Sequence, residues 1–283
     1  MQNHADKPVQ SSSHRQGAPL LSLRVSVSYG SKSVLRDVNI DIRCGEVLGL
    51  VGQSGSGKST LALAILGLLD RKRSCVEGTI ELGGQNLLER RERDLRNLRG
   101  KTLALVLQSP LSSLNPALRI RTQLREAWKA HARGSRAACD DAIRATLEHV
   151  SLPSNDEFLM KYASQMSIGQ AQRVLIAMAI IHRPALLIAD EATSALDVIT
   201  QSEILNLFRQ LNRTSGMAIL YISHDLASVA GICDRVAILH EGAVVELGST
   251  EQVLTRPQHE YTRRLIAAMP KMPTKQAANA AGQ

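Results

Sequence analysis

Aromatic residues are scarce in this sequence: Phe, Trp and Tyr together make up 2% of its 283 residues. This scarcity argues against a protein that binds single-stranded nucleic acid by stacking bases on aromatic side chains. Long apolar runs are also lacking, since the longest, residues 61–69 and 174–181, fall far short of the roughly 20 residues that a membrane-spanning helix needs. We therefore expect a chain that does not cross a membrane by itself. Residues 1–17 show no apolar core of the kind found in a secretory signal.

Cysteine is rare as well. Cys44, Cys75, Cys139 and Cys233 form no CxxC pair, which disfavours a zinc cluster or a disulfide framework and favours a reducing cytosol. Basic residues outnumber acidic ones, and the formal net charge is +8. This charge is compatible with nucleic acid, anionic lipid or polyphosphate ligands, and equally with an ordinary basic protein.

Two kinds of strand pattern recur along the chain. Residues 21–27 and 38–42 alternate apolar and polar side chains, as half-buried strands do. Nearly continuous apolar runs, which predict strands buried on both faces as in a parallel sheet, span residues 46–51, 186–189 and 218–222. Further strand candidates are residues 79–82, 103–107, 236–239 and 244–247, the last two flanking a Glu-Gly turn that predicts a hairpin.

Helical patterns separate these strands. Residues 61–69 predict a buried helix, and the charged residues 89–99 predict a helix face exposed to solvent. Residues 109–165 predict a helical insertion, in which Ile143, Leu147 and Val150 share one face. Strands that alternate with helices indicate an α/β fold with a mainly parallel sheet. The polar ends predict a disordered N-terminal tail, residues 1–20, and a loose C-terminal tail, residues 271–283.

The most specific motif is a phosphate-binding loop. Residues 52–59 match GxxxxGK[ST] throughout, between a predicted buried strand and a predicted helix. Glycines let successive backbone N–H groups point into one concavity, and the helix N-terminus adds partial positive charge. We expect Lys58 to reach the β- and γ-phosphates and Ser59 to bind Mg²⁺. The candidate nucleotide-binding residues are Gly52, Ser54, Gly55, Ser56, Gly57, Lys58, Ser59 and Thr60.

Polar residues at the ends of other predicted strands supply the remaining chemistry. Asp190 follows the apolar run 186–189, and we expect it to hold Mg²⁺ directly or through water. Glu191 is the candidate general base that activates the attacking water. Gln108 and His224 follow two further strands, where ligands bind in α/β sheets, and each is a candidate contact for metal-bound water or the γ-phosphate.

In order and spacing, these motifs resemble those of the ATP-binding subunits of ABC transporters, over residues 21–270. The resemblance implies an α/β P-loop NTPase (RecA-like) core with an antiparallel β subdomain and a helical subdomain at about residues 109–165. It assigns Gln108 to the Q-loop, as a Mg²⁺ ligand, and His224 to the switch histidine. It also implies further ATP contacts from the adenine-stacking Tyr29, from Asp197 of the D-loop, and from the signature residues Ser167, Gly169 and Gln170.

Residues 108–116 and 259–262 resemble the oligopeptide, dipeptide and nickel importer branch of that family. The resemblance implies hydrolysis of ATP, with Mg²⁺, to drive uptake of a peptide, nickel or a related small solute. The implied partners are a second ATPase subunit, identical or different, two transmembrane permease subunits, and indirectly an extracellular solute-binding protein, but no nucleic acid. The implied location is cytoplasmic, peripheral on the inner face of the cell membrane, with segment 109–165 receiving the permease.

Two residues depart from the family pattern. Ile168 replaces the first glycine of LSGGQ, and this β-branched residue restricts φ where glycine is permissive. A weakened composite site, or one that accepts only a matching partner, is therefore expected. Ala192 stands where proline usually follows the glutamate, which removes no catalytic atom. Some branch members hold an iron–sulfur cluster in a cysteine-bearing extension, and we expect none here because no cysteine follows Cys233.

Three alternative functions remain open at this point. An ATP-binding subunit of a non-transport complex, such as carbon–phosphorus lyase, is poorly separated from an importer subunit by sequence. A nucleic-acid-acting ABC ATPase is disfavoured because the chain has one cassette and no long coiled coil between Lys58 and Ser167. A binding-only regulator is disfavoured because Lys58, Asp190, Glu191 and His224 are all present.

Overall fold

The computed structural model describes residues 18–269 of the chain. Most of the two expected tails, residues 1–17 and 270–283, lie outside the described residues. Leu20, at the end of the expected N-terminal tail, is buried, and its N–H donates to the Ile42 carbonyl at 2.8 Å. The strand β1 begins at the next residue, Leu21.

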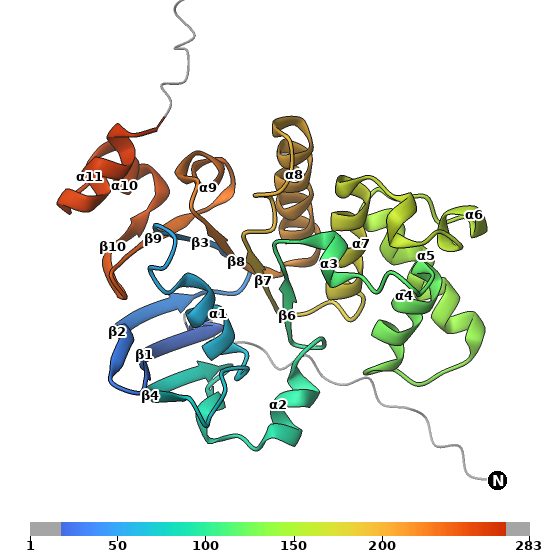
Figure 1. Cartoon of the computed structure of the whole chain (residues 1–283), viewed down its shortest axis with the longest axis horizontal. Helices are drawn as coiled ribbons and strands as arrows, with labels where there is room; N and C mark the ends of the chain where they lie inside the picture. The colour runs from blue at the N-terminus through green and yellow to red at the C-terminus, as the bar shows by residue number, and fades with distance from the viewer. Residues whose placement is uncertain (1–17, 270–283) are drawn as a thin grey trace, which may run out of the picture.

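A six-stranded sheet forms the centre of the molecule, with the order β10-β9-β3-β8-β7-β6 (Figure 1). Its strands are β3 (Val47–Val51), β6 (Leu103–Val106), β7 (Leu186–Asp190), β8 (Ala218–Ser223), β9 (Arg235–His240) and β10 (Ala243–Ser249). The first five pair in parallel, and only β10 pairs antiparallel, with β9. The mainly parallel α/β fold and the β9–β10 hairpin are thus confirmed.

A second, antiparallel sheet has the order β2-β1-β4-β5 and lies at the lower left of Figure 1. It contains β1 (Leu21–Tyr29), β2 (Lys32–Ile42), β4 (Ser74–Leu82) and β5 (Gln85–Asn86). β2 and β4 both extend well beyond the alternating residues 38–42 and 79–82. Both strands pair with β1 over the whole length of β1, up to Tyr29. Backbone hydrogen bonds to β1 therefore keep their exposed residues in strand conformation, although these residues show no hydrophobic pattern.

Two hydrophobic cores lie on opposite faces of the six-stranded sheet. On β3, Val47 and Val51 contribute to the core under the helical side, whereas Leu48 and Leu50 contribute to the core between the two sheets. Successive side chains of a strand point to opposite faces. A strand that is covered on both faces therefore carries the continuous apolar run that the sequence shows.

The helix after β3 is shifted from its expected position. α1 spans Lys58–Ile65, not residues 61–69. It begins directly after Gly57, whose φ of 107° lies in the left-handed region, and it ends before Gly67, whose φ is 62°. A glycine in the left-handed conformation ends helices readily because it has no Cβ. Leu66 and Leu69 are buried beyond the helix end, which explains why the apolar run is longer than the helix.

Helices fill the segment between β6 and β7 and form the lobe on the right of Figure 1. They are α3 (Pro110–Ser113), α4 (Ile120–Lys129), α5 (Arg136–His149), α6 (Asp156–Leu159), the 3-10 turn η2 (Ala163–Gln165) and α7 (Ile168–Ile180). Ile143, Leu147 and Val150 are all buried, as their spacing predicts. The remaining helices are η1 (Leu87–Glu89), α2 (Glu92–Leu98), α8 (Val198–Ser215), α9 (Leu226–Ile232), α10 (Thr250–Thr255) and α11 (Glu260–Ala267).

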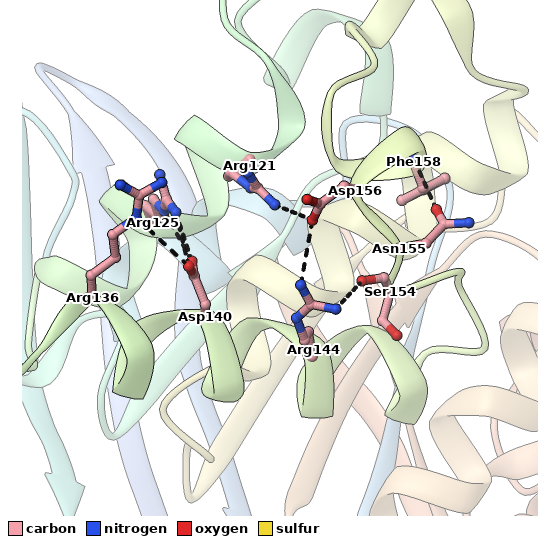
Figure 2. Close-up of polar contacts among 9 residues, drawn as sticks. All are labelled: Arg121, Arg125, Arg136, Asp140, Arg144, Ser154, Asn155, Asp156 and Phe158. Atoms are coloured by element: carbon pink, nitrogen blue, oxygen red, sulfur yellow. Dashed lines mark hydrogen bonds and ion pairs between the residues drawn. The ribbon is translucent and has the colours of Figure 1, made fainter.

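Ion pairs join the helices of this lobe on its outer surface (Figure 2). The Asp156 carboxylate accepts hydrogen bonds from Arg121 on α4 and Arg144 on α5. Arg125 on α4 donates to Asp140 on α5 at 2.8 Å. These contacts span α4, α5 and α6, so they fix the relative placement of three short helices. No helix within residues 18–269 combines the length and the apolar character that crossing a bilayer requires.

Arg235 connects the two sheets, and its removal should lower the stability of the fold. Its guanidinium donates to both carboxylate oxygens of Asp41 on β2 and to Glu46, a buried residue before β3. Arg235→Met leaves the Glu46 carboxylate without its cation, which costs about 3 kcal/mol in buried pairs. We expect a fall of about 2–3 kcal/mol in the free energy of unfolding, measured by urea denaturation.

The matched control is Arg24→Met. Arg24 makes an ion pair with Asp37 at 2.7 Å, shorter than the 3.0 Å pair between Arg235 and Asp41, but both of its side chains are exposed. Exposed pairs contribute about 0–1 kcal/mol, so this variant should change stability by less than about 1 kcal/mol. Equal losses in the two variants would contradict a special role for the Arg235 cluster.

Candidate nucleotide-binding site

The candidate site lies at the carboxyl ends of four parallel strands. The phosphate loop, residues 52–57, follows β3, and Glu191 follows β7. His224 follows β8, and Gln108 follows β6. Because these strands are parallel, their ends meet at one edge of the sheet, which is where α/β folds bind ligands.

Glycines at two positions of the loop are required by geometry. A Cβ on Gly52 would lie 2.2 Å from the Leu239 carbonyl oxygen, so the loop passes directly over the end of β9. Gly57 has a φ of 107° and caps α1 without any side-chain hydrogen bond. The first N–H groups of α1 are therefore not bonded to a capping side chain, and an anion can accept them.

Lys58 is buried inside this loop. Its Nζ donates to the carbonyl oxygens of Gly52, at 2.8 Å, and Gln53, at 3.0 Å. Nζ also lies 3.7 Å from Oε1 of Glu191. The ammonium is thus fixed between the loop backbone and a carboxylate, so it is positioned before any ligand arrives.

Glu191 lies between two basic groups. Its Oε2 is 3.4 Å from Nδ1 of His224, and its Oε1 faces Lys58. The residue has a φ of 48°, in the left-handed region that non-glycine residues rarely occupy, and its N–H donates to the Ile222 carbonyl at 2.9 Å. Such backbone strain is often found at functional sites, where it fixes the direction of a side chain.

Asp190 has the properties of a metal ligand. Its Oδ1 is buried and has no hydrogen-bond partner within the described residues. Burial raises the pKa of the Asp190 carboxyl above its usual range, and the nearby Ser59 hydroxyl and Lys58 ammonium oppose this shift only in part. An orphaned, buried carboxylate oxygen beside a hydroxyl suits a hard divalent cation, so the residues fit Mg²⁺.

Gln108 and Tyr29 lie apart from this cluster. Gln108 is exposed in the turn between β6 and α3. Tyr29 is exposed at the end of β1, next to the turn at Gly30. Within residues 18–269 no hydrogen bond or ion pair joins either residue to Lys58, Asp190 or Glu191, so their roles at the site stay predictions.

The signature and D-loop residues form a second group. Ser167 and Gln170 bond to each other's backbone N–H groups at the start of α7, as a capping box. Asp197 caps α8 by accepting from the N–H groups of Ile199 and Thr200. The two helix starts meet, since a Cβ on Gly169 would lie 2.7 Å from Thr200 Cγ2.

The substitution at Ile168 does not strain the backbone. Ile168 is the first residue of α7 and does not have a positive φ, so the freedom of glycine is not needed there. The expected φ restriction is therefore of no consequence in this structure. The side chain is 45% exposed, and any effect on a partner comes from its bulk.

The sequence patterns did not place Tyr261 at the site, yet its side chain contacts the phosphate loop. The Gln53 N–H donates to the Tyr261 hydroxyl at 3.2 Å. The only sequence signal was that residues 259–262 resemble an importer branch, which says nothing about where the tyrosine lies.

Comparison with known proteins agrees with this geometry. The family model for the ABC transporter matches residues 35–194, which contain the phosphate loop and Glu191. The chain belongs to the ABC transporter family. As an ABC ATP-binding cassette it binds nucleotide and is an ATPase. A second model, for the oligopeptide/dipeptide transporter C-terminal region, matches residues 245–283.

Several relatives cover most of this ABC cassette. The oligopeptide transport ATP-binding protein OppD of Escherichia coli is 40% identical, over 88% of this chain and 74% of its own length. The peptidoglycan transport ATP-binding protein YejF of Agrobacterium fabrum is 44% identical, over 89% of this chain and 47% of its own. The glutathione import ATP-binding protein GsiA of Shigella flexneri is 39% identical, over 85% of this chain and 40% of its own.

Solved structures show the same fold. CbiO1 from Clostridium perfringens, part of the transporter complex cbiONQ, superposes with a TM-score of 0.73 at 25% identity, over 89% of this chain and 96% of its own. A dimeric ATP-binding cassette, MJ0796, bound to ADP and Pi superposes with a TM-score of 0.70 at 25% identity, over 81% and 98%. The ABC ATPase architecture that the motifs imply is confirmed, and none of the relatives named here supports the carbon–phosphorus lyase alternative.

Proposed function

We propose that this ABC cassette hydrolyses ATP to drive uptake of a peptide, or of nickel or a related small solute, through a separate permease. The observation that carries the proposal is the match of residues 245–283 to the C-terminal region of oligopeptide and dipeptide transporters. The names of OppD and GsiA point to the same class of cargo. The cassette itself contacts ATP and not the cargo, so solute choice belongs to its partners.

In the proposed mechanism the phosphate loop binds the triphosphate first. The N–H groups at the start of α1 and the Lys58 ammonium supply the positive charge. The remaining members of the binding set are the loop residues Gly52, Ser54, Gly55, Ser56 and Gly57 and, in the first turn of α1, Ser59 and Thr60. Ser56 Oγ is buried without a hydrogen-bond partner among the described residues, so the loop retains polar capacity for a ligand.

Glu191 then acts as the general base. Its carboxylate lies beside Lys58 and His224, and triphosphate charge competes with it for the ammonium. Release from Lys58 leaves the carboxylate free to accept a proton from the attacking water. His224 lies at the end of β8, where it contacts Glu191 and is 57% exposed on its side chain, so it can hold the carboxylate and still reach a ligand.

We assign the metal to Asp190, Ser59 and Gln108. When bound, Mg²⁺ neutralises developing charge on the β- and γ-phosphates. Asp190 contributes Oδ1, which is buried and has no hydrogen-bond partner among residues 18–269, and Ser59 contributes the neighbouring hydroxyl at the start of α1. Gln108, the third proposed ligand, lies on the turn after the edge strand β6.

We infer that the active form is a pair of cassettes, identical or different. Ser167, Gly169, Gln170 and Asp197 lie at the starts of α7 and α8, and within residues 18–269 no hydrogen bond or ion pair joins them to Lys58, so we assign them to a second subunit's nucleotide. Val198 and Ile199, directly after Asp197, are 82% and 74% exposed. Such exposure is unusual for apolar side chains and favours a surface that the second cassette covers. We expect Tyr29, which is exposed at the end of β1, to stack on adenine.

A groove beside β6 is the proposed contact for the permease. β6 is the edge strand of the six-stranded sheet, and the groove beside it encloses about 360 Å³. Its lining includes Leu68, Leu105, Leu107 and Met178, with Ser113 and Ala127 from the helical segment. Leu68 and Leu107 are exposed, so an apolar permease segment would gain burial there. With the permease bound in this groove, the cassette would lie at the inner face of the cell membrane.

The test is reconstitution with the permease subunits encoded beside this chain and with their solute-binding protein. We expect the assembled complex in lipid vesicles to take up a labelled di- or oligopeptide only when ATP is enclosed with the cassette. A parallel arm with nickel distinguishes the solute class. Isolation of the cassette in a stable complex with soluble enzymes, without a permease, would contradict the proposal.

A further inference from the structure

The C-terminal helix α11 reaches the phosphate loop through one side chain. Tyr261, its second residue, is buried, and its hydroxyl accepts the Gln53 N–H at 3.2 Å. This is a contact between segments far apart in the sequence, the loop after β3 and a helix after β10. It is the kind of contact that a local motif cannot encode.

Gln53 links Tyr261 to Lys58. While its N–H donates to Tyr261, its carbonyl accepts from Lys58 Nζ at 3.0 Å and from the Ser56 N–H at 3.2 Å. Both backbone groups of one loop residue are therefore held, one by α11 and the other by the phosphate-binding lysine. A shift of Tyr261 would move the peptide that supports the ammonium.

Tyr261 itself is held from several sides. Its ring stacks on His240 at the end of β9, with centroids 3.8 Å apart and planes 17° from parallel. Its N–H donates to Nδ1 of His259, which caps α11. Glu246 on β10 accepts the N–H groups of His259, at 3.0 Å, and Gln258, at 2.8 Å. These contacts fix the start of α11 against the β9–β10 hairpin, so the hydroxyl has a set position.

The Glu246 carboxylate is suited to this anchoring role. Burial opposes its charge, but the nearby Thr262 hydroxyl and the hydrogen bonds from the N–H groups of Gln258 and His259 outweigh burial and lower the pKa of the Glu246 carboxyl. It therefore remains charged at neutral pH and keeps its two backbone bonds. The anchor of α11 is independent of the phosphates and is present before nucleotide binds.

We propose that Tyr261 is a positioning residue for ATP binding, through which α11 holds the phosphate loop in its binding conformation. The inference rests on the proposed function, because it concerns the affinity of the same nucleotide site. If the loop is already ordered, less of the binding free energy is lost in ordering its backbone when the triphosphate binds. Without the hydroxyl, the Gln53 N–H loses its acceptor and the loop gains alternative conformations.

Tyr261→Phe tests the proposal, since it removes one oxygen and keeps the ring that stacks on His240. We expect the Kd for MgATP and MgADP to rise three- to tenfold, by calorimetry or fluorescence titration. KM for ATP should rise by a similar factor while kcat stays within about twofold. The matched control is Tyr162→Phe, in which the altered ring lies under Arg119 in the helical lobe, 5.1 Å from its guanidinium carbon. This control should leave both quantities unchanged.

Hydrogen exchange separates positioning from general stability. In Tyr261→Phe, amide exchange over residues 50–57 should be about tenfold or more faster than in the unaltered protein, while β8 keeps its protection. A fall in melting temperature with unchanged ATP affinity and unchanged loop exchange would overturn the proposal. Failure of the unaltered protein to bind ATP would instead overturn the proposed function, so the two failures are distinguishable.

Discussion

Glu191→Gln should slow ATP hydrolysis by about 100-fold or more while MgATP binding is retained. Glutamine has nearly the same shape, so it can keep the left-handed backbone and the N–H bond to Ile222. It cannot accept a proton from water, and a general base contributes about 10²–10⁴ to the rate. The change also removes the negative charge 3.7 Å from Lys58 Nζ, so affinity for the triphosphate should not fall. Steady-state phosphate release and nucleotide titration measure the two effects.

The control for this variant is Glu203→Gln. Glu203 also pairs with a cation, Arg173, at 2.9 Å, but it is exposed on α8, and within residues 18–269 no hydrogen bond or ion pair joins it to the phosphate loop, Glu191 or His224. The control should change turnover by less than about twofold, because exposed ion pairs contribute little. Turnover of Glu191→Gln within about threefold of the unaltered protein would remove Glu191 from the base role and leave His224 as the next candidate.

Lys58→Ala should weaken MgATP binding by about 10- to 100-fold and abolish measurable hydrolysis. Hydrogen bonds to charged groups contribute about 1.5–3 kcal/mol, and each 1.4 kcal/mol is a factor of ten in affinity. The loss should be larger for ATP than for AMP, because the ammonium faces the phosphate loop and not the adenine end of the site. Equilibrium titration with ATP, ADP and AMP provides the comparison.

Removal of Lys58 also frees two carbonyl groups, those of Gly52 and Gln53, which accept its Nζ. Part of the lost affinity therefore reflects loop disorder, which hydrogen exchange over residues 52–57 would reveal. Lys129→Ala is the matched control, since Lys129 pairs with Glu126 on the surface of α4 and both side chains are exposed. An ATP affinity of Lys58→Ala within threefold of the unaltered protein would mean that the α1 N–H groups hold the phosphates without the lysine.

Most of the six-stranded sheet was predictable because its strands are covered on both faces. β7 and β8 correspond to short apolar runs in the sequence that are bounded by polar residues. In the structure, both strands begin and end within about one residue of those runs. β2 and β4 were predicted only in part, since their outer halves are exposed and are defined by pairing with β1. α1 was displaced because its limits depend on the backbone of Gly57 and Gly67, not on apolar periodicity.

The candidate site also has features that were predictable from the sequence and features that were not. The phosphate-binding motif is eight consecutive residues, the loop 52–57 and the first two residues of α1, so its chemistry is readable from the sequence. Asp190 and Glu191 were readable because they directly end a buried strand. The placement of Glu191 between Lys58 and His224 was not, because it depends on the lateral order of β3, β8 and β7 in the sheet.

By itself, the sequence determined the phosphate loop, because its contiguous residue types have few structural alternatives. It also determined the fold class and the membership of the ABC family, because these follow from the order and spacing of short motifs and apolar runs along the chain. Only the tertiary structure decided that Tyr261 touches Gln53, that Gly169 meets Thr200, and that a buried Asp190 oxygen has no partner in the part of the chain that the structure describes. Such contacts join segments whose separation along the chain carries no information about their distance in space. These contacts form when the sheets and helices pack around the two hydrophobic cores. A local sequence pattern does not contain that information.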